Sequence, residues 1–77
     1  MSTSPILLTI AVLGGTGKEG KGLAYRWAKA GYRILIGSRN PEKAKAAALE
    51  ILDLLGGKAF VEGTTNVRAA ELAEIVV

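Results

Sequence analysis

An apolar run followed directly by closely spaced glycines constrains the fold of this sequence most strongly. Residues 6–13 read ILLTIAVL, and residues 14–22 read GGTGKEGKG. An apolar run of this length, bounded by Pro5 and Gly14, is typical of a parallel strand that is covered on both faces. Helical spacing of apolar residues begins at residue 18, so the glycines form a turn between a strand and a helix. The chain therefore predicts an α/β unit.

The same alternation of strand and helix patterns continues to the end of the chain. The predicted elements are a strand over 6–13, a helix over 18–30 stopped by Gly31, a strand over 32–37, a helix from Asn40-Pro41 to Gly56-Gly57, a strand over 58–63, a brief helix capped by Thr65 or Asn66 and running through Ala73, and a strand over 75–77. The final stretch also fits one helix running to the end. This order predicts a Rossmann-type parallel sheet with strand order 3-2-1-4, which is half of a doubly wound domain.

Each of the two longer predicted helices has one apolar stripe at helical spacing. Such a stripe is expected to face the sheet. The stripes are Leu23, Ala24, Trp27 and Ala28 on the first helix, and Ala44, Ala47, Ala48, Ile51, Leu52 and Leu55 on the second.

Length and composition exclude several classes of function. The 77 residues make at most one small domain, and the apolar content of 49% argues for a packed chain. A net charge of +3 is too weak for a nucleic-acid partner but suits a small anionic ligand. Cysteine and histidine are absent, which excludes disulfides, thiolate nucleophiles and Cys/His zinc sites. The longest apolar run is too short for a bilayer, so we expect a cytoplasmic protein with no membrane partner.

The glycines fit two nucleotide-binding motifs. Gly15 with Gly20-Lys21 resembles a Walker A loop, but that loop needs a hydroxyl after the lysine to hold magnesium, and residue 22 is glycine. The Gly15-x-Gly17-x-x-Gly20 spacing instead keeps every part of a dinucleotide-binding turn. Its first glycine allows the tight turn, its second lets the backbone approach the pyrophosphate, and its third lets helix and strand pack closely. The sequence therefore favours a dinucleotide.

The end of the second strand distinguishes NAD from NADP. An NAD site carries an acidic residue near this point, which binds the ribose 2′-hydroxyl. Here the strand ends Gly37-Ser38-Arg39, and the first acid is Glu42. Ser38 and Arg39 can donate hydrogen bonds to a 2′-phosphate, and the planar guanidinium can stack on the adenine. These residues favour NADP.

The expected site therefore binds a cofactor and contains no catalytic side chain and no metal ligand. Free N–H groups at the start of the first helix face the phosphates, and a lysine there adds positive charge. The expected cofactor-binding residues are Gly14, Gly15, Thr16, Gly17, Lys18, Glu19, Gly20, Ser38, Arg39 and Lys43.

The sequence IAVLGGTGKEGKGLAYRWAKAGYRILIGSRNPEKA, residues 10–44, resembles the N-terminal part of the F420-dependent NADP reductases. The GGTG-x-x-G turn, the GSR after the second strand and the EKA at the following helix start are all similar, and NVRAAELAEIVV at 66–77 resembles the third helix and fourth strand of that family. The resemblance implies hydride exchange between NADP and coenzyme F420, with Ser38 and Arg39 as the 2′-phosphate binders. The charged pair Lys18-Glu19 is unusual for the loop.

Further expectations concern the extent of the chain, its possible parents and its assembly. The chain is expected to be a single NADP-binding half-domain over 1–77 and a fragment of a larger oxidoreductase, inactive alone. Related parents with the same kind of turn are short-chain dehydrogenase-like enzymes, which would need a Tyr–Lys pair further along, and pyrroline-5-carboxylate reductases. Tyr25 and Tyr32 are interpreted as packing residues. The last alternative is a structural half-domain without catalysis, and an uncovered sheet edge predicts self-association.

Overall fold

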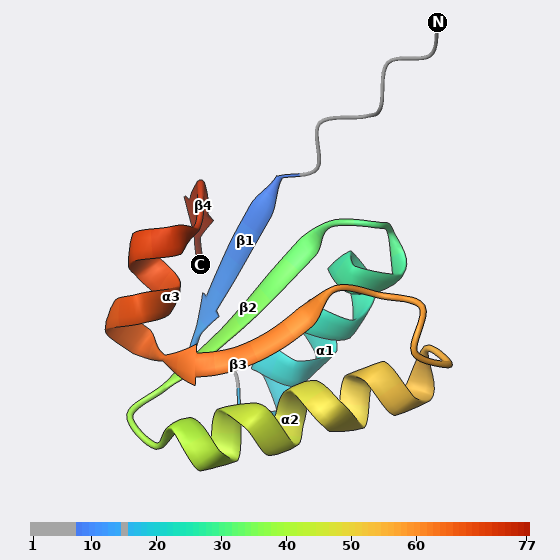
Figure 1. The fold of residues 1–77 in the computed structure, drawn as a ribbon, viewed down its shortest axis with the longest axis horizontal. Helices are drawn as coiled ribbons and strands as arrows, with labels where there is room; N and C mark the ends of the chain where they lie inside the picture. The colour runs from blue at the N-terminus through green and yellow to red at the C-terminus, as the bar shows by residue number, and fades with distance from the viewer. Residues whose placement is uncertain (1–7, 15) are drawn as a thin grey trace, which may run out of the picture.

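The computed structural model describes residues 8–14 and 16–77 and contains seven elements (Figure 1). Strands and helices alternate along the chain, as the sequence predicts. The elements are β1 (Thr9–Leu13), α1 (Lys18–Lys29), β2 (Arg33–Ser38), α2 (Pro41–Leu54), β3 (Val61–Thr65), α3 (Asn66–Leu72) and β4 (Ile75–Val76).

The four strands form one parallel sheet in the order β3-β2-β1-β4, which confirms the predicted topology. The register aligns the carboxyl ends of the three longer strands. Leu13 of β1 pairs with Gly37 of β2, and Gly37 pairs with Thr64 of β3. The segments that follow these strands therefore start side by side at one edge of the sheet.

The helices cover the sheet in two layers. α1 and α2 pack on one face, and α3 packs on the other face against β1 and β2 (Figure 1). The main core consists of small and branched aliphatic side chains, and the second core is much smaller. The main core contains Ile10, Val12, Ala24, Ala28, Ile34, Ile36, Ala44, Ala47, Ala48, Ile51 and Val61, and the second contains Ala11, Leu35 and Ala69.

Small residues allow α2 to approach the sheet closely. A Cβ on Gly63 of β3 would overlap the backbone carbonyl of Ala44 and the amide of Lys45. Ala44 itself is fully buried. The helix therefore lies directly on the strand backbone at this point. Any residue larger than glycine at position 63 would force α2 to shift away from β3.

The predicted stripes are largely confirmed. All six stripe residues of α2 face the core, four of them buried and Leu52 and Leu55 half-buried against it. On α1, the buried alanines and Trp27 also match. Leu23 does not match, because it is only half-buried and lines a hollow on α1 with Glu19. Tyr25, which was not part of the predicted stripe, packs against the core.

Several predicted boundaries were wrong by a few residues. The third strand begins at Val61 instead of residue 58, because Lys58 N still donates to Leu55 O at 3.2 Å in the turn after α2. It runs on to Thr65, which pairs with Ser38. The second strand likewise covers 33–38 instead of 32–37, and Tyr32, just before it, is 37% exposed.

The C-terminal region forms a helix and a strand and not one continuous helix. Thr65 caps α3, since its hydroxyl oxygen accepts a hydrogen bond from Arg68 N at 3.1 Å. The helix ends at Leu72, one residue before the predicted end. Val77 N donates to Ala11 O at 2.8 Å and so extends the pairing of β4 with β1.

Residues 6 and 7 of the first predicted strand lie outside the described residues, as does Gly15. Within the part of the chain that the structure describes, no helix has the length and apolar character needed to cross a membrane.

Candidate functional site

The expected cofactor-binding residues that the structure describes lie at the carboxyl ends of β1 and β2. The glycine turn and the start of α1 follow β1, Ser38 ends β2, and Arg39 follows it. Because Leu13 pairs with Gly37, the two segments leave the sheet as neighbours. Crevices at the carboxyl ends of parallel strands are where open α/β sheets bind ligands.

The turn after β1 depends on the backbone of Gly14. Its φ is +66°, in the left-handed region where glycine carries no steric cost. Its carbonyl accepts a hydrogen bond from Gly17 N at 3.5 Å, and its own N–H donates to Asn66 Oδ1 at 3.2 Å. The chain therefore reverses at Gly14 and enters α1 at Gly17. Gly15 lies outside the described residues.

The first N–H groups of α1 have no side-chain partner among the described residues. Gly17 is the N-cap, and no described side chain accepts a hydrogen bond from the first turn. The other two helices differ, because Asn40 caps α2 and Thr65 caps α3. The first N–H groups of a helix have no partner within it and carry partial positive charge. The geometry of α1 therefore suits an anion.

Charged side chains of both signs stand in this first turn. Lys18 and Glu19 are exposed, and Gly20 is half-buried as the helix turns toward the sheet. Lys18 can approach a bound phosphate without displacing a partner in the described residues. Glu19 instead lines a separate hollow of about 440 Å³ along α1, with Gly22, Leu23 and Arg26.

Ser38 and Arg39 differ in their surroundings. Ser38 is only 8% exposed, and its hydroxyl oxygen accepts a hydrogen bond from Asn40 N at 3.1 Å. A hydroxyl that accepts one bond still has a proton to donate. Arg39 is exposed and free to reorient. The first acid after β2 is Glu42, in the first turn of α2, where its N–H donates to Asn40 Oδ1 at 3.0 Å.

Thr16 and Lys43 line the same hollow, although they belong to different halves of the expected site. This hollow of about 260 Å³ lies between α1 and α2. Its lining also contains an ion pair, in which Lys21 Nζ lies 3.2 Å from Glu50 Oε1. The structure therefore brings the glycine turn and the start of α2 together at a space with two lysines.

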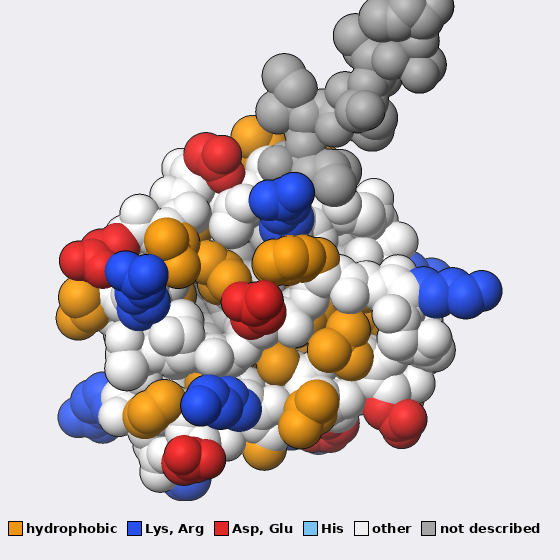
Figure 2. Space-filling model, viewed as in Figure 1, with side chains coloured by type: hydrophobic (Ala, Val, Ile, Leu, Met, Phe, Trp, Pro, Cys, Tyr) orange, Lys and Arg blue, Asp and Glu red, His pale blue; other side chains and the backbone are white. Residues whose placement is uncertain are grey.

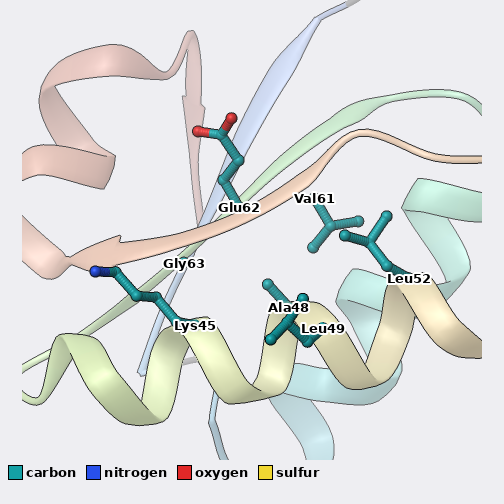
Figure 3. A pocket seen from close by; sticks show the side chains of 7 residues that line it. All are labelled: Lys45, Ala48, Leu49, Leu52, Val61, Glu62 and Gly63. Atoms are coloured by element: carbon teal, nitrogen blue, oxygen red, sulfur yellow. The ribbon is translucent and has the colours of Figure 1, made fainter. Parts of the chain in front are cut away.

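A different hollow lies beside the outer edge of β3 and not at the carboxyl ends of β1 and β2. It has a volume of about 330 Å³ (Figure 3). Figure 3 shows Leu52 of α2 and Val61 of β3 facing each other, while the Glu62 carboxylate points away from them. Its lining is mainly aliphatic and offers no set of hydrogen-bond donors for a phosphate. We assign no part of the cofactor site to it.

Comparison with known proteins identifies the family. The model of the family described as NADP oxidoreductase coenzyme F420-dependent matches residues 9–77. The chain belongs to this family. The match includes the glycine turn, both expected cofactor-binding segments and all four strands.

Curated members of the F420-dependent NADP oxidoreductase family align with nearly all of these residues. The F420-dependent NADP reductase of Methanothermobacter thermautotrophicus is 49% identical over 73 residues, which is 94% of this chain. That of Methanothermobacter marburgensis is 49% identical over 91% of the chain, and that of Methanocaldococcus jannaschii is 47% identical over 91%. The chain spans 32% of the length of each of these relatives.

Two features of the site in this family member were missed by the analysis of sequence. The Lys21–Glu50 ion pair joins residues 29 apart, and the bond from Gly14 N to Asn66 Oδ1 joins residues 52 apart. No local pattern relates such positions. The sequence pattern predicts Asn66 only as a helix cap, and its position directly after β3 is the one feature that could have indicated this contact.

Proposed function

We propose that this chain binds NADP(H) as the dinucleotide-binding part of an enzyme that transfers hydride between coenzyme F420 and NADP. The observation that carries the proposal is that Ser38 and Arg39 follow the Gly37 position of β2, which pairs with Leu13, the last residue of β1 before the glycine turn and the uncapped start of α1. One segment offers donors for a 2′-phosphate, and the other offers backbone N–H groups for the pyrophosphate.

The glycine turn supports pyrophosphate binding because its backbone is accessible. Among the described residues, the nearest atom to a Cβ on Gly17 beyond its chain neighbours would be Gly14 O at 4.0 Å, so these residues leave the space above Gly17 open. A pyrophosphate placed there reaches the N–H groups of the first turn of α1. Lys18 adds a positive charge at the same place, whereas the Glu19 carboxylate opposes binding to some extent.

The end of β2 supports a 2′-phosphate over a 2′-hydroxyl. Ser38 has a free hydroxyl proton, Arg39 has five N–H donors, and Lys43 lies in the first turn of α2. Residues 38–41 contain no carboxylate that could accept a hydrogen bond from the ribose 2′-hydroxyl. The end of β2 therefore offers donors to the 2′-phosphate of NADP and lacks the acceptor that an NAD site uses for the 2′-hydroxyl.

Hydride transfer is the chemistry that the nicotinamide ring supplies when the cofactor is bound. In this proposal, the described residues around the site bind and orient the cofactor, and we assign none of them to proton transfer. The F420 part of the proposal is supported by the family and by the names of the relatives, of which this chain spans 32%. We propose that contacts to F420 come from sequence outside these 77 residues, so the isolated chain does not turn over.

Calorimetric titration with NADP, NAD and ATP tests the proposal. We expect NADP to bind at least tenfold more tightly than NAD, because one charge-assisted hydrogen bond contributes about 1.5–3 kcal/mol. ATP lacks the 2′-phosphate and is expected to bind more weakly than NADP. Equal affinity for NADP and NAD would refute the cofactor assignment, and F420-linked reduction of NADP by the 77-residue chain would refute its dependence on further sequence.

We also propose that the chain self-associates through exposed apolar side chains. Ile75, Val76 and Val77 at the β4 edge are 40–51% exposed, and Figure 2 shows further hydrophobic side chains in several groups over α2, β3 and α3, separated by charged ones. Exposed apolar groups beside a strand edge favour association with another copy. Sedimentation at increasing concentration is expected to show a rising average mass. A constant monomer mass would exclude self-association.

A further inference from the structure

The side chain of Asn66 links two strand ends that are not neighbours in the sheet. Asn66 follows β3, which is separated from β1 by β2. Its Oδ1 nevertheless accepts the hydrogen bond from Gly14 N, in the turn after β1, at 3.2 Å. The side chain therefore passes over the end of β2 and joins the third strand–helix connection to the first.

Gly37 provides the space for this crossing. A Cβ on Gly37 would lie 2.8 Å from Asn66 Oδ1, 3.0 Å from Asn66 Cα and 3.0 Å from Leu13 Cδ2. The first of these distances is shorter than real Cβ atoms show. Glycine at this position of β2 therefore lets the Asn66 side chain reach the turn.

The helix cap of α3 does not require Asn66. Thr65 already accepts the capping hydrogen bond from Arg68 N. Asn66 is the first residue of α3, and its side-chain oxygen Oδ1 accepts a hydrogen bond from Gly14 N in the glycine turn. This bond therefore serves the conformation of the turn more than that of its own helix.

The bond determines how the turn is held. Gly14 donates its N–H to Asn66 and accepts at its carbonyl from Gly17 N, so both of its backbone polar groups are used. Gly17 is the N-cap of α1, and the direction of its neighbouring N–H groups depends on this turn. We propose that Asn66 is a positioning residue for cofactor binding, which holds the Gly14 turn so that the start of α1 faces the pyrophosphate.

This inference rests on the proposed function, but its structural half is measurable without cofactor. Amide hydrogen exchange at Gly14, followed by NMR, reports the bond to Asn66 directly. In Asn66→Ala, Gly14 exchange is expected to accelerate at least threefold, while amides of β2 and α2 keep their rates. Asn66→Asp keeps an acceptor oxygen and is expected to keep the protection.

Thr65→Ala is the matched control, because it removes a neighbouring hydrogen bond of α3 and leaves the Asn66 side chain in place. It is expected to leave Gly14 exchange unchanged. Equal acceleration in Thr65→Ala and Asn66→Ala would overturn the inference, since Gly14 would then report only the stability of α3. Unchanged exchange in Asn66→Ala would overturn it as well. Should Asn66→Ala fail to fold, Gly37→Ala displaces Oδ1 and is expected to give the same selective acceleration.

The binding half is read by calorimetry on the same variants. Asn66→Ala is expected to weaken NADP and NAD by the same factor, roughly three- to tenfold, because both cofactors share the pyrophosphate. A faster Gly14 exchange with unchanged affinity for both cofactors would overturn the positioning role. Failure of the parent chain to bind either cofactor would refute the proposed function instead. The exchange result would then show only whether the hydrogen bond between Asn66 and Gly14 protects the Gly14 amide.

Discussion

The Ser38 hydroxyl oxygen accepts a hydrogen bond from the Asn40 amide at 3.1 Å, so the end of β2 is tied to the cap of α2. Asn40 in turn accepts hydrogen bonds from Glu42 N and Lys43 N, at 3.0 and 3.4 Å. These bonds form a short chain from the strand to the helix. Ser38 therefore contributes to the fold and, in our proposal, to the recognition of the 2′-phosphate.

Ser38→Ala is expected to reduce both stability and NADP affinity. Loss of the bond from Asn40 N should lower the free energy of unfolding by about 0.5–1.5 kcal/mol. Loss of the hydroxyl donor should weaken NADP roughly three- to tenfold and leave NAD nearly unchanged. Urea unfolding and calorimetry measure the two effects. Thr65→Ala serves as the control, because it loses a comparable hydroxyl bond and is expected to keep its NADP affinity.

Arg39→Ala is expected to separate the two cofactors more strongly. The guanidinium is exposed and makes no hydrogen bond to a described residue, so its removal should leave the free energy of unfolding unchanged. NADP affinity should fall roughly ten- to hundredfold and NAD affinity should barely change, because only NADP carries the phosphate. Arg33→Ala, at the opposite end of β2 where the guanidinium stacks 5.2 Å from the Phe60 ring, is the matched control. Equal loss of NADP and NAD in Arg39→Ala would contradict a role for Arg39 in phosphate recognition.

Gly17→Val is expected to abolish cofactor binding without unfolding the chain. Gly17 has φ −77° and ψ 168°, an extended conformation open to any residue, and a side chain there meets no close atom. The valine would occupy the space proposed for the pyrophosphate. Far-UV circular dichroism should stay native while NADP and NAD binding are both lost. Gly22→Ala, also in open space on α1, should bind normally and gain stability. An unfolded Gly17→Val chain would give Gly17 a structural role and remove this support for the site.

Gly63→Ala is expected to destabilise the fold through packing alone. The added methyl group would overlap the Ala44 carbonyl, so α2 must move away from β3. Overpacking of this kind costs about 1–3 kcal/mol, which urea unfolding would detect as a lower midpoint with an unchanged slope. Gly17→Ala is the control, since its methyl group enters open space. A midpoint equal to that of the parent chain would show that α2 adjusts freely.

The sheet topology and the core stripes could be predicted from the sequence because they depend on local patterns. A strand, a glycine turn and a helix over residues 9–29 are compatible with few sheet topologies. The alanine stripe of α2 has a regular helical spacing. The start of β3 could not be predicted in this way. Phe60 is as apolar as a strand residue, yet the strand begins only where Val61 pairs with Ile34.

The residues of the candidate site could be predicted within each segment of the chain. The contacts between these segments were harder to predict. The positions of Thr16 and Lys43 follow from the turn and from the helix start, but their common hollow depends on how α1 and α2 pack. The bond from Asn66 to Gly14 depends on the missing Cβ of Gly37, on the strand between them. Such contacts arise from the tertiary arrangement, which the spacing of residues along the chain does not contain.

The close approach of α2 to the sheet has a consequence for how cofactor preference can change. The buried side chains of α2 are mostly alanines packed directly against strands, so enlarging them is costly. Arg39 and Lys43 are exposed and outside this core. If the proposed phosphate contacts hold, substitutions at these two positions change affinity for the phosphate at little cost in folding. Selection or engineering could then move the proposed site between dinucleotides by changing two surface positions, whereas enlarging the buried alanines of α2 would disturb its packing on the sheet.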